Sequence, residues 1–209
     1  MADDVQTAIQ DRIVRAGRGR VFIAKDFLDL GSRDAVDQAL SRLAKAGDIQ
    51  RLGRGLYQYS QMNKRLGISV APDANEIADA LGRQTGCRVT PSGAFAANQL
   101  GLSTQVPAKP VYLTDGRSRQ VKVGNSVFTI KHVAPKELPV GSRLSATVFQ
   151  ALKYLGKDAI DDRVISRLRR ILSVKARQEL LRDARYTTDW IGTFARMITQ
   201  DEVQSVTHG

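Results

Sequence analysis

The sequence predicts an α+β fold, and three features lead to that class. Segment 33–46 has apolar residues at helical spacing, and segments 48–52 and 56–59 alternate like strands around a Gly-Arg-Gly turn. Helical periodicity returns from residue 144 onward. At 209 residues and 42% hydrophobic side chains, the chain is long enough for one large domain or two small ones, so we expect a folded protein.

The N-terminal segment begins with a helix and a short strand. Residues 5–13 place apolar side chains at helical spacing, which predicts a first helix that ends at the glycines of segment 17–19. The apolar run 21–23 predicts a short strand. Residues 24–28 predict a short second helix that closes near Gly31.

Segment 33–46 predicts the most regular helix of the chain. Ser32 stands where an N-cap should, because its hydroxyl can accept a hydrogen bond from the first turn, and Gly47 supplies a C-terminal stop. The apolar residues of this helix fall at i, i+3, i+4 and i+7, and they are Val36, Ala39, Leu40 and Leu43.

The opposite face of this helix is polar, and it has two interpretations. Exposed Arg, Gln and Ser side chains can hydrogen-bond base edges and phosphates in a major groove. The alternative is a solvated face with an Arg33–Asp37 pair, and the carboxylates of Asp34 and Asp37 favour this alternative because they repel phosphates.

The two strands that follow favour the first interpretation. Segments 48–52 and 56–59 predict a β-hairpin, with Gly53-Arg54-Gly55 as its turn and an arginine at the tip. Two short helices, a third with a polar face and then such a hairpin is the order of a winged helix-turn-helix. We therefore predict this DNA-binding domain over residues 1–62, with these DNA-contacting residues: Arg33, Gln38, Ser41, Arg42, Lys45, Arg51 and Arg54.

The stretch GRGRVFIAKDFLDLGSRDAVDQALSRLAKAGDIQRLGRGLYQYS resembles the N-terminal winged-helix domain of AbiEi-type antitoxins of bacterial type IV toxin–antitoxin systems. The segments NEIADALGRQTG, TPSGAFAANQLGLSTQVPAKPVYLTDG and VFTIKHVAPKEL resemble the C-terminal region of the same family, and the likeness fades after about residue 140. The resemblance implies an autorepressor that binds its own promoter and opposes a nucleotidyltransferase toxin of abortive infection, without necessarily touching it.

Residues 63–209 predict a second, mixed α/β domain that ends in helices. After Asn63-Lys64-Arg65, the pattern predicts a helix near 73–85 and a shorter one opened by Pro91-Ser92-Gly93. Strands are expected at three segments, 111–114, 119–123 and 127–132, the last two joined by Gly124-Asn125. From Leu144 onward the pattern is helical.

The charge of the chain points to a polyanionic partner. Lys and Arg number 32 against 21 Asp and Glu, which gives a formal net charge of +11. Such a balance attracts nucleic acid, although solubility alone also benefits from net charge. The segment 163–185 is rich in basic residues, as is the acid-free run 117–136, and either is a second nucleic-acid surface or a solvated face. The residues that we single out for the second basic surface are Arg163, Arg167, Arg170, Lys175 and Arg177.

Several function classes find no support in the sequence. There is no HExxH, CxxC, GxSxG, Walker-type loop or GxGxxG, so we predict no enzyme, no cofactor and no metal site. His132 and His208 are too few for a metal cluster, and Cys87 is a single thiol that we expect in the core. No apolar run is long enough for a membrane helix, and we expect a cytoplasmic protein.

These observations lead to one functional prediction with an alternative. The chain is predicted to be a sequence-specific autorepressor and antitoxin that binds duplex DNA at its own promoter, as repeated or dimeric units on inverted repeats. The alternative is a winged-helix regulator that responds to a small ligand and has no link to a toxin. A nuclease is the third class, which metal-dependent cleavage of DNA would reveal.

Overall fold

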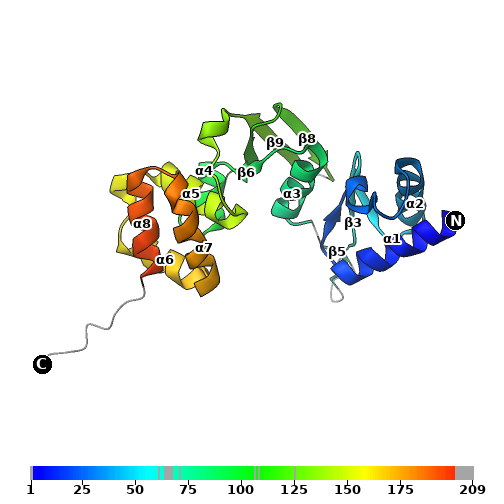
Figure 1. Cartoon of the computed structure of the whole chain (residues 1–209), viewed down its shortest axis with the longest axis horizontal. Coiled ribbons are helices and arrows are strands. Elements are labelled where there is room, and N and C mark those ends of the chain that lie inside the picture. Colours follow the sequence, from blue (N-terminus) through cyan, green and yellow to red (C-terminus); the bar gives the residue numbers. More distant parts are fainter. Residues whose placement is uncertain are drawn as a thin grey trace, which may run out of the picture. The chain divides into compact units, whose positions relative to one another are not determined.

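The computed structural model of the chain describes residues 2–60, 62–63, 68–70, 72–105, 107, 109–124 and 126–200. The chain is an α+β protein with helices at both ends, which confirms the predicted class (Figure 1). It divides into two compact units. The first is formed by Met1–Val89 with Gln120–Phe128, and the second by Thr90–Arg119 with Thr129–Gly209.

The first unit begins with the elements that the sequence predicts, in the predicted order. They are α1 (Ala2–Ala16), β1 (Val21–Phe22), the 3₁₀ turn η1 (Ala24–Phe27), α2 (Arg33–Ala46), β2 (Gln50–Gly53) and β3 (Leu56–Gln58). The predicted short second helix is therefore a 3₁₀ turn. An antiparallel pair of short strands follows, β4 (Met62–Asn63) and β5 (Ile68–Ser69), and then α3 (Ala74–Thr85).

A three-stranded antiparallel sheet has the order β1-β3-β2. In the middle strand, Tyr57 pairs with Phe22 on one side and with Arg51 on the other. Leu56, Tyr57 and Gln58 of this strand are all buried. Successive strand residues point to opposite faces, so both faces of β3 are covered.

The core of the first unit lies between α1, α2 and this sheet. The buried stripe of α2 packs against α1, as its helical spacing predicts. Each large side chain removed from water contributes about 1.5–3 kcal/mol, so this cluster supplies most of the drive for folding of the segment. Its fully buried members are Ile9, Ile13, Phe27, Val36, Leu40 and Leu43.

Side chains of α3 bind the outer edge of the sheet. Glu76 accepts a hydrogen bond from the backbone N–H of Val21 at 3.3 Å and pairs with Arg20 at 3.2 Å. Arg83 donates to the carbonyl of Val21 at 2.9 Å and to the carboxylate of Asp26. β1 is an edge strand, and these bonds satisfy backbone groups that an open edge would expose.

The contacts of α3 bear on the domain division. The sequence predicts a boundary between residues 62 and 63, and the first compact unit runs on to Val89. The physical reason is that α3 packs on β1 and η1 through the ion pairs just described. Of Asn63-Lys64-Arg65, after which the sequence predicts the helix near 73–85, residues 64 and 65 lie outside the described part of the chain.

The strands of the middle of the chain form a four-stranded sheet with the order β6-β7-β9-β8. They are β6 (Val89–Pro91), β7 (Val111–Thr114), β8 (Arg119–Val123) and β9 (Ser126–His132), with α4 (Gly93–Gln99) between β6 and β7 and the 3₁₀ turn η2 (Pro135–Glu137) after β9. β7 and β9 run parallel, with Tyr112 opposite Ile130. The last three strands match the prediction, although Asn125 of the predicted β8–β9 turn lies outside the described residues.

The second unit ends in helices, as predicted. They are α5 (Arg143–Leu155), α6 (Asp162–Ile171), α7 (Val174–Asp183) and α8 (Asp189–Thr199), with 3₁₀ turns η3 (Lys157–Ala159) and η4 (Ala184–Tyr186) between them. The side chains of Ser142, Asp161 and Ser173 cap α5, α6 and α7 by accepting a backbone hydrogen bond from the first turn. Asp161 is thus a cap of the helix that the sequence placed there.

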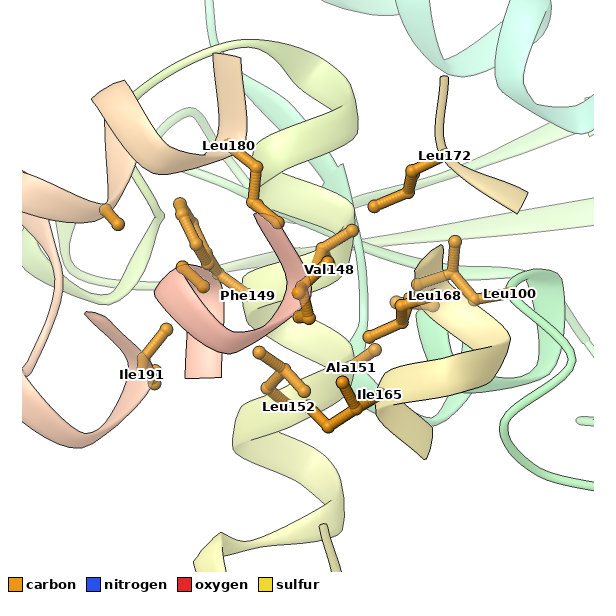
Figure 2. Close-up of a cluster of buried hydrophobic side chains, with 14 of the residues drawn as sticks. Leu100, Val148, Phe149, Ala151, Leu152, Ile165, Leu168, Leu172, Leu180 and Ile191 are labelled. Carbon is orange, nitrogen blue, oxygen red and sulfur yellow. The ribbon is translucent and has the colours of Figure 1, made fainter. Parts of the chain in front are cut away.

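α5 is the central helix of this unit and packs against α4, α7 and α8. Figure 2 shows the apolar side chains of α5, among them Val148, Phe149 and Leu152, surrounded by residues from the other helices. Residues 145–152 of α5 are all buried, which is why this helix has no continuous polar face. The other helices each bury one side and expose the other.

Candidate nucleic-acid interface

The candidate interface of the first unit begins with the exposed face of α2. Ser32 caps the helix, with its Oγ accepting from the backbone N–H of Ala35 at 3.3 Å, and Gly47 ends it with a φ of +84°. The buried stripe holds the helix on α1, so the opposite side faces solvent. Of the residues predicted to contact DNA, Arg33, Gln38, Arg42 and Lys45 are exposed, whereas Ser41 is half-buried.

Not every exposed side chain on α2 is equally available to a ligand. Arg33 is bound to Asp37 through a hydrogen-bonded ion pair of 2.7 Å, which is the pair that the alternative interpretation of this face foresaw. Gln38 and Lys45 have no hydrogen bond or ion pair with another side chain in the described part of the chain. An incoming phosphate or base edge can therefore bind these two without breaking an existing contact.

The β2–β3 hairpin carries the other predicted contacts. Arg51 and Arg54 are both exposed, and the buried side chains of Leu52 and Leu56 anchor the two strands on either side of the turn. Gly55 has a φ of +69°, which is the left-handed conformation that a glycine tolerates in such a tight turn. The structure therefore presents the guanidinium of Arg54 at the tip of the hairpin, as predicted.

A contact that the sequence did not indicate supports this hairpin. Nε2 of Gln84, in α3, donates a hydrogen bond to the carbonyl of Arg54 at 3.3 Å. A Cβ on Gly55 would lie 2.9 Å from the same Nε2, so the glycine permits this close approach. Gln84 and Arg54 are 30 residues apart, and no local sequence pattern predicts a contact between them. α3 therefore fixes the hairpin turn as well as the edge of the sheet.

The segment before α2 is held by Arg12. Nη1 and Nη2 of Arg12 donate to Oδ1 and Oδ2 of Asp29 at 2.7 Å each, and Nη1 also donates to the carbonyl of Asp26. The hydrogen bonds from Arg12 lower the pKa of Asp29 below its ordinary value, and the same bonds raise the pKa of Arg12. This two-pronged pair connects α1 to the η1–α2 segment and so positions the start of α2.

The predicted second basic surface lies on α6 and α7. Arg163, Arg167, Arg170 and Lys175 are exposed. Arg177 is a correction to the prediction, because it is half-buried and lies three residues before the buried Leu180 on the same side of α7. The spacing from Leu180 was the signal that could have excluded it from a surface.

Other basic and titratable residues of the second unit have structural contacts. Nε and Nη2 of Arg169 both donate to the carbonyl of Met197 in the last turn of α8, at 3.2 and 2.6 Å. Nδ1 of His132 lies 2.8 Å from the carbonyl oxygen of Gly116. Cys87 was predicted to lie in the core, which is wrong. It is half-buried and follows Gly86, the glycine that ends α3.

Metal-ligand clusters and membrane-spanning helices are both absent from the described residues. No group of three or more His, Cys, Asp or Glu side chains there could hold a metal ion. His208 lies outside that part of the chain. None of the helices described has both the length and the apolar character needed to cross a lipid bilayer.

Comparison with known protein families places the chain in one of them. Residues 8–180 match a family of unknown function, DUF6088. The chain belongs to the DUF6088 family. The match runs from α1 into α7, so it includes α2, the β2–β3 hairpin and the arginines of α6. No curated protein matches the chain. The DUF6088 description assigns no activity, and a function for this chain therefore has to be argued from its own residues.

Proposed function

We propose that the chain is a transcriptional regulator whose first unit is a winged helix-turn-helix that binds duplex DNA. The observation that carries this proposal is the pairing of two exposed features on one small core. α2 offers Gln38 and Lys45 on its polar face, and the β2–β3 hairpin offers Arg54 at its tip. The element order α1, β1, η1, α2, β2, β3 is the order that such a domain requires.

The polar face of α2 and the tip of the β2–β3 hairpin would contact different parts of the DNA. A glutamine on a helix can make a bidentate contact to adenine in the major groove, whereas arginine and lysine on a hairpin reach phosphates or the minor groove. Arg42 and Arg51 add positive charge around these contacts, whereas Arg33 is paired with Asp37, and Ser41 lies at the margin of the face. Base contacts would then specify the sequence, and phosphate contacts would set the register.

We further propose a biological role for this regulator. The resemblance to AbiEi-type antitoxins supports a cytoplasmic autorepressor that acts on its own promoter and is paired with a nucleotidyltransferase toxin in phage defence. A single module of this size buries little surface on DNA, so two copies on inverted repeats would supply the specificity. We propose a regulatory and not an enzymatic role.

A second candidate is a regulator that responds to a small ligand. One observation favours it, a depression of about 300 Å³ formed by α7, η4 and α8. Its lining includes Leu181, Arg185, Thr187, Asp189 and Arg196, so it would suit a small polar molecule. Its volume lies at the lower limit of ligand sites. A compound that changes both the thermal midpoint and operator affinity would favour this candidate.

The deciding experiment is a gel shift with the full chain. The probes are the DNA upstream of its own gene and a scrambled duplex of equal length and composition, at two salt concentrations. A discrete shift of the upstream probe that resists competitor DNA supports the proposed regulator. Equal binding to both probes, weakened equally by salt, overturns sequence-specific regulation.

A further inference from the structure

A row of arginines lies along one side of α6. Arg163, Arg167 and Arg170 are exposed and fall at i, i+4 and i+7, so they share one face of the helix. The opposite face is buried through Ile165 and Leu168, which fixes α6 in the core of the second unit. A rise of about 1.5 Å per residue spreads the three arginines over roughly 10 Å. α6 therefore holds three exposed arginines in a row, and the guanidinium of Arg167 lies against the Gly101 turn.

These arginines have no carboxylate partners in the described part of the chain. The arginines of the first unit differ, since Arg12 and Arg83 are among those paired with carboxylates. Two acidic residues of the second unit bind backbone groups. Asp161 caps the backbone N–H of Val164, and Asp183 accepts from the backbone N–H of Ser142 at 2.8 Å. No ion pair within the described residues neutralises the row, although Asp161 and Asp162 bring negative charge to the end of α6 that carries Arg163.

The stability of α6 does not account for this arrangement. Like charges at i, i+3 and i+4 are unfavourable, and both spacings occur among the three arginines. Arg163 also lies in the first turn, where the helix dipole disfavours a cation. Residues that destabilise their own helix are expected at sites where they bind a ligand. The ligand that relieves these repulsions is an anion, and a row of guanidinium groups matches a series of phosphates.

We propose that the Arg163–Arg167–Arg170 face of α6 binds the phosphate backbone of duplex DNA as a second contact surface, separate from α2 and the hairpin. The choice of DNA as the ligand rests on the proposed function. A duplex is favoured over single-stranded RNA because recognition of unpaired bases uses aromatic stacking, and α6 contains no aromatic residue. This surface adds affinity without reading sequence.

The test uses the full chain and the double variant R163Q/R170Q. Arg167 is left in place because its guanidinium lies against the Gly101 turn, where a Cβ would come within 2.7 Å of it. The matched control is K153Q/K157Q, which removes the same charge from exposed positions of the same unit. Affinity for the upstream duplex, the scrambled duplex and a single-stranded RNA of equal length is measured over a range of salt concentrations.

The expected result is a salt slope that falls by about 1.8 in R163Q/R170Q, since each phosphate contact contributes roughly 0.9. The slope of R163Q/R170Q should fall equally for both duplexes, and the slope of K153Q/K157Q should hardly change. The thermal midpoint of R163Q/R170Q should not decrease, because the substitutions remove a repulsion between arginines. Equal slopes for the two variants would overturn the proposal, as would a larger loss on RNA than on duplex DNA. If the wild type does not prefer the upstream duplex, the proposed regulator fails, while the slope difference still tests this surface.

Discussion

Arg83 and Asp26 are 57 residues apart and form a two-pronged ion pair, with Nε 3.0 Å from Oδ1 and Nη2 3.1 Å from Oδ2. The same Nη2 donates to the carbonyl of Val21, and Asp26 accepts from the backbone N–H of Ile23 at 3.0 Å. Asp26 thus organises η1 and binds α3 at the same time. This relationship explains why α3 belongs to the first unit, and why loss of the ion pair should affect the elements that we propose bind DNA.

The first prediction concerns this pair. Replacement of Arg83 by Ala should lower the free energy of unfolding by about 1 kcal/mol, because the Arg83 side chain is 40% exposed and solvent screens much of the charge attraction. Urea unfolding followed by circular dichroism measures the change. Lys25→Ala is the control, since Lys25 is an exposed neighbour of Asp26. Equal stabilities of R83A and K25A would show that the pair does not hold α3.

The second prediction separates the two proposed DNA contacts. Gln38→Ala should weaken binding to the upstream duplex by about 1–3 kcal/mol and relax base preference, since a base contact is lost. Arg54→Ala should weaken binding to all duplexes alike and reduce the salt slope by about one. Competition gel shifts at several salt concentrations distinguish the two patterns. The assignment of α2 as the recognition helix is wrong if Q38A keeps full affinity and base preference.

The elements that the sequence predicted are those determined locally. The bounds of α2 followed from the apolar period, from Ser32 as cap and from Gly47 as stop, and all three lie within the helix or next to it. The packing of α3 on the first unit could not be predicted in this way, because it depends on contacts between distant residues. Arg83 contacts Asp26, and Gln84 contacts Arg54. The candidate residues were selected by type and spacing alone, and that selection cannot tell an exposed side chain from a half-buried one.

Two particular residues illustrate this limit. Ser41 and Arg177 were selected as polar residues on helices that carry charge, yet both are half-buried. Ser41 borders the buried stripe of α2, and Arg177 lies beside Leu180 on α7. In each case the residue lies at the edge of the polar face, where the packing of a neighbouring element decides its exposure. The spacing of apolar residues predicts which residues lie at the centre of a polar helix face, but it does not decide the exposure of residues at the edge of that face.

The third prediction concerns pH and the Arg12–Asp29 pair. The hydrogen bonds from Arg12 lower the pKa of Asp29, so the folded state holds this proton less tightly than the unfolded state. The pair therefore stabilises the fold above the ordinary carboxyl pKa, and this contribution is lost as the pH falls through the lowered value. Asp29→Asn should be less stable than wild type at pH 7, and the difference should shrink toward pH 3.

Urea midpoints of wild type and D29N at the two pH values measure this effect. Asp11→Asn is the control, because it removes an exposed carboxylate from α1, the helix that carries Arg12. A difference between wild type and D29N that is the same at pH 7 and pH 3 would contradict the linkage.

The fourth prediction compares two glycines of the second unit that both have positive φ. Gly141 has a φ of +121°, and a Cβ there would overlap the carboxylate of Asp183, which accepts from the backbone N–H of Ser142. Gly156 has a φ of +80°, and a Cβ there would meet nothing within 4 Å. Gly156→Ala should cost about 1 kcal/mol of unfolding free energy from backbone strain alone. Gly141→Ala should cost more, because it also displaces Asp183 from the start of α5.

Thermal and urea unfolding of the two variants decide this point. The expected order of stability is wild type, then G156A, then G141A, with the extra loss in G141A on the order of 1–2 kcal/mol for the broken hydrogen bond to a charged group. The double variant G141A/D183A should not recover that loss in full, because the Cβ of residue 183, 2.6 Å from the added methyl group, remains. If G141A is as stable as G156A, Asp183 does not hold the N-terminus of α5.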